Sequence, residues 1–218
     1  MANLRTGSYG SYYGSFKNES SPLSKLEMQA NATYIRNYLS NKGWSLNSIC
    51  AILGNMQAES SINPGRWQAD NVGVTALGYG LVQWTPSTNY TEWATSNGFD
   101  DYSEMDTNLA RIVYEVENNL QWIKTDVYPI TFDQFATGKI SFVELPLYYL
   151  TEAFLINYER PADQSNSVKE YRTSLANYWF NYLNGSTPNI PVTPTKTKRK
   201  HYNFLLFNAR KRRNEWIK

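Results

Sequence analysis

The feature of this sequence that most constrains its fold is a helical repeat of apolar residues between residues 24 and 185. The clearest instance lies near the middle of the chain and comprises Leu109, Ile112, Val113, Val116, Leu120 and Ile123. Such spacing places apolar side chains along one face of an α-helix, which must then pack against another element. We therefore predict a domain built mainly by the packing of helices.

Capping signals divide this repeat into separate helices. The pattern Ser-x-x-Glu occurs at 24–27 and at 141–144 and is typical of a helix start. Ser45 is a candidate N-cap, and Thr85 stands before a proline. Glycines follow several of the apolar runs and mark helix ends. The predicted helices span 24–43, 45–60, 85–98, 109–123, 141–158 and 168–185.

Residues 66–84 lack the helical repeat. Gly73, Gly78 and Gly80 separate short apolar pieces there, a pattern that favours a small β-hairpin or a layer of loops. The expected fold class is therefore mainly α, within the α+β class, with a small β-hairpin layer.

The composition changes three times along the chain. Residues 1–22 are rich in Gly, Ser and Tyr without periodicity and predict a flexible arm. The helical domain spans 23–185, and the Pro- and Thr-rich segment 186–195 is typical of a linker. The tail 196–218 holds nine basic residues and one acidic residue, so the net charge of +2 divides into +8 on the tail and −6 on the rest. We expect neither a secretory signal nor a transmembrane segment, because no apolar run is long enough.

The scarcity of Cys and His excludes several kinds of chemistry. The chain has one Cys and one His, too few for an internal disulfide or a Cys/His zinc site. His201 lies in the basic tail, so a Ser-His-Asp or Cys-His mechanism would have to draw its base from there. We expect no metal and no cofactor. Cleavage of a glycosidic bond requires only carboxyl groups, which this chain has.

Glu59 is the carboxyl group that best fits such a reaction. It follows Ile52 by about two helical turns and Met56 by one, so it shares their apolar face. Partial desolvation and the nearby helix C-terminus both favour the protonated acid that a glycosidase needs. The alternative is an ordinary helix-end Glu that faces solvent or pairs with Arg66.

Other acidic residues are weaker candidates. Asp70 lies in the following loop, where it could stabilise a developing oxocarbenium ion or hold water, or simply form a turn with Asn71 and Gly73. An acidic run precedes the helix at 109, where a helix N-terminus favours negative charge, and we interpret it as structural. This run comprises Asp100, Asp101, Glu104 and Asp106.

Three segments, in order, carry a resemblance to a known family. They are GNMQAES at 54–60, GYGLVQWTP at 78–86 and FLINYERP at 154–161. Together they resemble the phage tail lysozyme family and, more distantly, the lytic transglycosylases and goose-type lysozymes. The resemblance covers roughly residues 28–184. It implies a lysozyme-like helical domain with a cleft beside the small β element.

The resemblance also implies roles for individual residues. Glu59 matches the general acid, and Tyr158 matches a tyrosine whose hydroxyl orients that acid in the transglycosylases. Gln83 matches a strand that lines the cleft, and core packing is the alternative for Tyr158 and the aromatic residues. We interpret Glu159 and Arg160 as a structural ion pair. The predicted substrate-binding residues are Trp67, Thr75, Tyr79, Gln83 and Trp84, and the predicted catalytic residues are Glu59, Tyr158 and Asp70.

The implied activity is cleavage of peptidoglycan between N-acetylmuramic acid and N-acetylglucosamine. No second carboxylate stands at a matched position, so an anhydromuramyl product of a lytic transglycosylase stays open beside hydrolysis. An inactive structural or wall-binding tail subunit is the other alternative. The implied setting is the virion, at the phage tail tip, or the host cytoplasm before release through a holin. The tail Lys196–Lys218 could contact other tail proteins or an anionic surface, and nothing in it reads nucleic acid bases.

Overall fold

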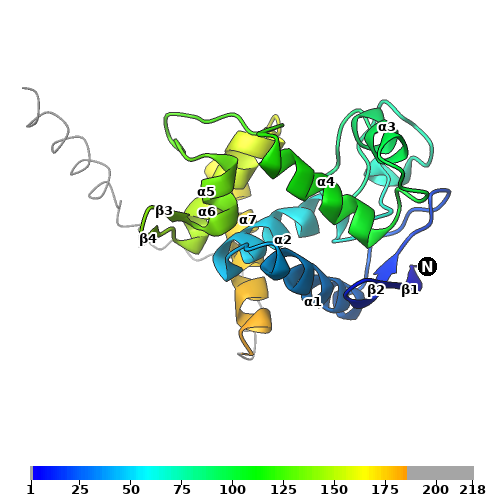
Figure 1. Cartoon of the computed structure of the whole chain (residues 1–218), viewed down its shortest axis with the longest axis horizontal. Helices are drawn as coiled ribbons and strands as arrows, with labels where there is room; N and C mark the ends of the chain where they lie inside the picture. The colour runs from blue at the N-terminus through cyan, green and yellow to red at the C-terminus, as the bar shows by residue number, and fades with distance from the viewer. Residues whose placement is uncertain (1, 186–218) are drawn as a thin grey trace, which may run out of the picture.

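The computed structural model describes residues 2–185, and these are mainly helical (Figure 1). Two short antiparallel hairpins accompany the helices. This architecture confirms the predicted mainly α class with a small β component. In chain order the elements are β1 (Asn3–Gly7), β2 (Gly10–Gly14), α1 (Lys25–Asn41), α2 (Leu46–Ser60), the 3-10 turn η1 (Gln68–Asp70), α3 (Thr88–Ser96), α4 (Met105–Glu117), α5 (Phe132–Thr137), β3 (Lys139–Ile140), β4 (Val143–Glu144), α6 (Leu147–Phe154), the π-helical turn η2 (Leu155–Glu159) and α7 (Asn166–Leu183).

Helix α2 is the centre of the packing. It contacts α1, α5, α6 and α7, and its residues from Ile49 to Met56 are all fully buried. Gly54 permits the closest of these approaches, because a Cβ at this position would lie 2.8 Å from the carbonyl oxygen of Arg172 on α7. The last turn of α2, which carries Glu59, is therefore held against α7.

Several helix starts agree with the capping signals and two do not. The helix predicted from Thr85 begins only at Thr88, with Ser87 as its N-cap. Ser24 forms the predicted capping box, and Ser45 caps α2. Residues 141–144 instead belong to the hairpin β3–β4, and α6 begins only after Pro146. A capping box that we did not predict, at Thr131, starts α5. The prediction at 141–144 was wrong because a capping pattern describes only local backbone preferences, which a turn can also satisfy.

The helix predicted over 109–123 is shorter at its C-terminal end. Helix α4 ends at Glu117, and the chain then turns through Asn118 and Asn119, the latter with a positive φ of 50°. Leu120 and Ile123 are consequently exposed rather than buried on the helix face.

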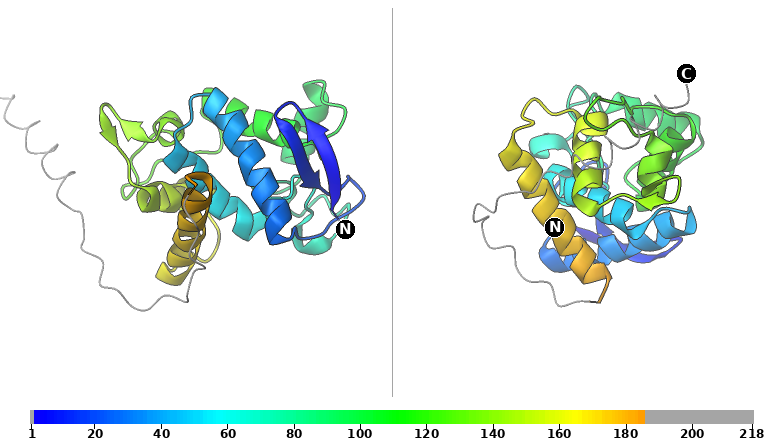
Figure 2. Two further views of the ribbon diagram at one scale, coloured as in Figure 1. Left: turned by 90° about the horizontal axis from the view of Figure 1, so that it is seen from below. Right: turned by 90° about the vertical axis from the view of Figure 1, so that its left-hand side faces the viewer.

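The N-terminal segment is a hairpin, where we had expected a flexible arm. Strands β1 and β2 pair from Asn3–Gly14 to Gly7–Gly10 and lie beside α1 (Figure 2). Tyr12 is completely buried, which gives the hairpin an apolar anchor. The composition of this segment indicated disorder because the residues that stabilise the hairpin lie elsewhere in the chain.

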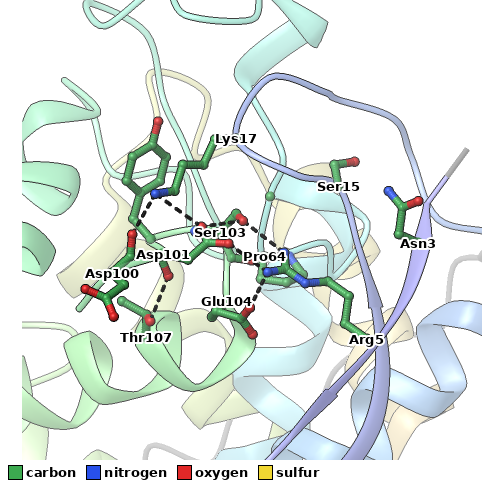
Figure 3. Close-up of polar contacts among 12 residues, drawn as sticks. Asn3, Arg5, Ser15, Lys17, Pro64, Asp100, Asp101, Ser103, Glu104 and Thr107 are labelled. Atoms are coloured by element: carbon green, nitrogen blue, oxygen red, sulfur yellow. Dashed lines mark hydrogen bonds and ion pairs between the residues drawn. The ribbon is translucent and has the colours of Figure 1, made fainter.

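The N-terminal hairpin is held by the acidic run at 100–106. Arg5 of β1, whose side chain is 7% exposed, forms ion pairs with Asp101 (2.8 Å) and Glu104 and donates to the hydroxyl of Ser103 (2.9 Å), as Figure 3 shows. Tyr12 also donates to Glu104. The structural interpretation of this run agrees with these contacts, although its main partner is the hairpin.

Residues 66–84, predicted as a small β-hairpin or a layer of loops, form loops and not a hairpin. Only isolated bridges form there, from Trp67 to Tyr79 and from Tyr79 to Trp84. Positive φ values at Asp70 and Gln83 turn the chain repeatedly, so no regular ladder extends. Within residues 2–185, no helix has both the length and the hydrophobicity needed to cross a bilayer. The predicted linker 186–195 and basic tail 196–218 lie outside the described residues.

Candidate active site

A cleft of about 760 Å³ lies where the end of α2 meets the loop at 82–85, helix α4 and the turn η2. Four of the eight predicted catalytic and substrate-binding residues line it, namely Glu59, Gln83, Trp84 and Tyr158. The fold therefore brings together parts of all three segments that carry the resemblance. The other lining residues are Gln68, Val82, Thr85, Asn89, Arg111, Glu115, Leu120, Gln121, Glu159, Arg160 and Pro161.

Glu59 stands in the last turn of α2 with its side chain 24% exposed. Its Oε1 accepts a hydrogen bond from Nη2 of Arg172, on the neighbouring helix α7, and the two groups form an ion pair. The partner is therefore not Arg66, the residue we had considered from the sequence. Arg66 pairs instead with Asp70, with 3.0 Å between Nη1 and Oδ1. Glu59 is thus open to the cleft on one side and held by a buried cation on the other.

Glu159 places a second carboxyl group beside the same cation. Its side chain is 5% exposed, and its Oε2 lies 3.4 Å from Nη1 of Arg172. Burial, and next the negative charge of Glu59, raise the pKa of Glu159 well above its ordinary value. The expected ion pair with Arg160 does not form, because Nη1 of Arg160 donates to the backbone carbonyls of Gln121 (2.6 Å) and Asn157 (2.7 Å).

Glu115 is a third carboxyl group in the cleft wall, with its side chain 1% exposed. Three donors surround it: Nε of Arg111 at 2.8 Å, Nε1 of Trp84 at 3.0 Å and the hydroxyl of Tyr158 at 2.5 Å. Burial raises its pKa, and the hydrogen bond from Tyr158 and the charge of Arg111 oppose that rise. Glu115 therefore fixes two aromatic side chains of the cleft in place.

Tyr158 lines the cleft as predicted, but its contact differs from the one implied by the resemblance. Its hydroxyl donates to Glu115 and not to Glu59. The tyrosine is buried and stacks on Phe154, with ring centroids 4.4 Å apart. Its predicted role in catalysis stays a prediction. Because its hydroxyl does not contact Glu59, any effect of Tyr158 on Glu59 is indirect.

Gln83 and Trp84 occupy the cleft through different kinds of contact. Nε2 of Gln83 donates to the carbonyls of Gly80 (2.8 Å) and Arg66 (3.1 Å), and its buried Oε1 has no partner among the described residues. Trp84 stacks on Tyr90, with centroids 4.3 Å apart, so one face of the indole is already covered. The amide of Gln83 is therefore held by the backbone of its own loop with its carbonyl oxygen buried, and Trp84 presents mainly an edge to the cleft.

Four predicted site residues lie away from the cleft. Trp67 and Tyr79 are buried and pack edge to face against each other, with centroids 4.6 Å apart, so they are core residues and not stacking platforms. Thr75 is exposed and uses its carbonyl to accept from Ser87. Asp70 holds Arg66 and accepts from Ser20 at 2.6 Å. Within residues 2–185, the cleft lining does not include any of these four.

Sequence reasoning missed Glu115 and Arg172, and it gave Glu159 only a structural role beside Arg160. A signal existed for Glu115, since it follows Ile112 by three positions and therefore lies toward the apolar face of α4, with Arg111 four residues before it. A charged residue on an apolar face calls for a partner. Arg172 gave no comparable signal, because its contact with Glu59 joins residues 113 positions apart.

The comparisons with known proteins agree with this geometry. The family model described as phage tail lysozyme matches residues 30–183, which include every lining residue of the cleft. The chain belongs to the phage tail lysozyme family. Among its relatives is "Morphogenesis protein 1" of Bacillus phage B103, 47% identical over 170 residues. That match covers 78% of this chain and 44% of the relative, so the chain spans less than half of the longer protein.

Proposed function

We propose that this protein cleaves the glycan strand of peptidoglycan between N-acetylmuramic acid and N-acetylglucosamine, with Glu59 as the general acid. The position of Glu59 supports this most directly. It is the carboxyl group of the cleft that combines partial exposure with a fixed orientation, because Glu115 and Glu159 are almost completely buried. A general acid must reach the glycosidic oxygen and yet be aimed by its surroundings.

The rest of the cleft fits a carbohydrate. Polar side chains such as Gln68, Gln83 and Asn89 line it, and amide side chains suit the hydroxyl and N-acetyl groups of a sugar. Glu115 accepts hydrogen bonds on both oxygens, so in this arrangement it supports the wall and does not act as a nucleophile. A single reactive carboxyl group is compatible with attack by water or by the muramic 6-hydroxyl.

The biological setting that we propose is the virion, where the enzyme would open the cell wall during phage entry. The family and the name of the relative, a morphogenesis protein of a phage, support a virion-associated role. Contacts with other tail proteins through Lys196–Lys218 are part of this proposal. A lytic transglycosylase and an inactive wall-binding tail subunit are the alternatives.

Digestion of purified peptidoglycan with mass spectrometry of the products tests the proposal. The wild type, Glu59→Gln and the surface control Glu92→Gln are compared. Reducing muramic ends from the wild type and the control, but not from Glu59→Gln, support a muramidase, whereas anhydro ends indicate a transglycosylase. Equal activity of Glu59→Gln would overturn the assignment of the acid, and inactivity of the wild type would favour a structural subunit.

A further inference from the structure

Glu59 belongs to a cluster of three charged side chains, together with Arg172 and Glu159. Arg172 contacts Glu59 through Nη2 and Glu159 through Nη1, the latter at 3.4 Å, while Nη1 also donates to the carbonyl of Asn55 at 2.7 Å. The side chain of Arg172 is 9% exposed. A single buried guanidinium therefore faces two carboxyl groups that come from separate elements, α2 and η2.

The charges of this cluster balance only if it holds one proton. Two ionised carboxylates and one guanidinium leave an uncompensated negative charge in a cluster whose Arg172 and Glu159 side chains are nearly buried, which is unfavourable. One proton shared by the carboxyl pair brings the total charge to zero. Like charges in contact also cannot both persist without cost, so such a pair titrates as a unit.

Glu159 is the resting position of that proton. Apart from the long contact with Arg172, neither of its carboxyl oxygens accepts a hydrogen bond from the described part of the chain. Glu59 has the closer contact with the guanidinium and the greater access to solvent. Burial and the charge of Glu59 also raise the pKa of Glu159 well above its ordinary value, and a protonated Glu159 can donate to Glu59.

We infer that Glu159 is a positioning residue that holds the catalytic proton and shares it with Glu59, with Arg172 balancing the remaining charge. The inference rests on the proposed function of Glu59. It also explains how a carboxyl group paired with an arginine can act as an acid, since the proton is stored next to it.

Protons are conserved over one catalytic turnover. The proton passes from Glu159 to Glu59 and then to the glycosidic oxygen, and the bond from this oxygen to the sugar carbon breaks with its electron pair on the oxygen. Water adds to that carbon and loses a proton, which returns to the carboxyl pair. The pair therefore ends each turnover with one proton, as it began.

The charged and titratable groups near Glu159 define what a pH profile would report. Glu59 of α2 and Arg172 of α7 act on it directly. Arg111 and Glu115 of α4, with Tyr158 and Arg160 on either side of it in the chain, line the same cleft. Substitution of Glu159 alone leaves all of these in place.

The first test is the pH profile of kcat/KM for wild type and Glu159→Gln on peptidoglycan. The amide preserves shape but stores no titratable proton, so we expect the alkaline limb to move down by at least about one pH unit. A one-unit move lowers the active fraction at neutral pH about tenfold. KM should stay within about twofold, since substrate positioning is unchanged. The matched control is Glu152→Gln, because Glu152 is another buried glutamate and accepts a hydrogen bond from the hydroxyl of Tyr128, away from the cleft lining.

The outcomes separate this inference from the proposed function. Glu59→Gln should be inactive at every pH, whereas Glu159→Gln should recover activity in acid. A Glu159→Gln profile that matches wild type, with Glu59→Gln inactive, would overturn the role of Glu159 and leave the role of Glu59 intact. A profile lowered equally at every pH would show a merely structural role and also overturn it.

A second measurement does not depend on activity. Carbon-13 NMR of the side-chain carboxyl groups, assigned through Glu59→Gln and Glu159→Gln, follows protonation in the intact protein. We expect the Glu159 signal to report a protonated acid at neutral pH. A Glu159 carboxylate that is already ionised at pH 5 would contradict the inference, even if the enzyme is active.

Discussion

The hydroxyl of Tyr158 donates a 2.5 Å hydrogen bond to Oε2 of Glu115 and thereby ties the turn η2 to helix α4 across the cleft. The two residues are 43 positions apart in the chain. Both side chains are buried, so water does not compete for the contact. The bond joins two elements that line the cleft, and its loss should affect stability as well as activity.

Tyr158→Phe tests the strength of this tie. Glu115 keeps its bonds to Arg111 and Trp84 but loses one of three donors, so we expect a loss of about 1–3 kcal/mol in the free energy of unfolding. Urea denaturation measures the change, with the exposed Tyr171→Phe as the control, expected within about 0.5 kcal/mol of wild type. Equal stabilities of the two variants would show that the bond does not hold the walls together.

Arg5→Leu should detach the N-terminal hairpin. Removal of a nearly buried cation leaves Asp101 and Glu104 close together without the guanidinium that they share, and we expect a loss of about 3 kcal/mol. Lys17→Ala removes a more exposed pair with Asp101, at 3.7 Å, and should cost less than about 1 kcal/mol. Hydrogen exchange of the β1 amides locates the effect, and unchanged protection in Arg5→Leu would contradict it.

Glu159→Gln should also change how stability depends on pH. Because folding raises the pKa of Glu159, the folded protein keeps a proton that the unfolded chain releases above about pH 4.3, the ordinary value for Glu. The wild type therefore loses stability as pH rises from there toward the folded pKa, and the variant lacks this loss. Urea denaturation between pH 4 and 8 should show the variant gaining on wild type as pH rises. A constant difference across this range would contradict the buried, protonated state.

Gly54→Ala should disturb the packing of α2 on α7. The new methyl would lie 2.7 Å from the backbone nitrogen of Ala176 and 2.8 Å from the carbonyl oxygen of Arg172, so the helices must separate. We expect destabilisation of about 1–3 kcal/mol, opposite to the usual gain of Ala in a helix, and reduced activity because Arg172 moves away from Glu59. The exposed helical position Asn37→Ala serves as the control for helix propensity. Stabilisation by Gly54→Ala would show that the contact yields easily.

Asp70→Asn separates the predicted catalytic role of Asp70 from its position. The residue bonds to Arg66 and Ser20 outside the cleft lining, so we expect activity within about twofold of wild type. Glu59→Gln in the same peptidoglycan assay gives the scale of a true catalytic loss. A comparable loss in Asp70→Asn would restore Asp70 as a candidate for stabilising the transition state.

The Gly, Ser and Tyr content of residues 1–22 predicted a flexible arm, but the structure has a hairpin there. Composition failed because β1 and β2 are stabilised by distant acidic residues and by the burial of Tyr12. The acidic run at 100–106 was correctly interpreted as structural, but local helix electrostatics did not reveal its partner Arg5. Composition reports what a segment can do alone and not what another segment provides.

The sequence by itself determined the helical class, the capped starts of α1 and α2, and the family through three short segments, and it made Glu59 the candidate acid. These follow from periodicity and local capping, which act over a few residues and are therefore readable along the chain. Only the tertiary structure decided which charges meet. It placed Arg172 between Glu59 and Glu159, directed Tyr158 to Glu115, and removed Trp67, Tyr79, Thr75 and Asp70 from the cleft. The physical reason is that these contacts join residues dozens to more than a hundred positions apart, where packing and desolvation set the partners and no local pattern records them.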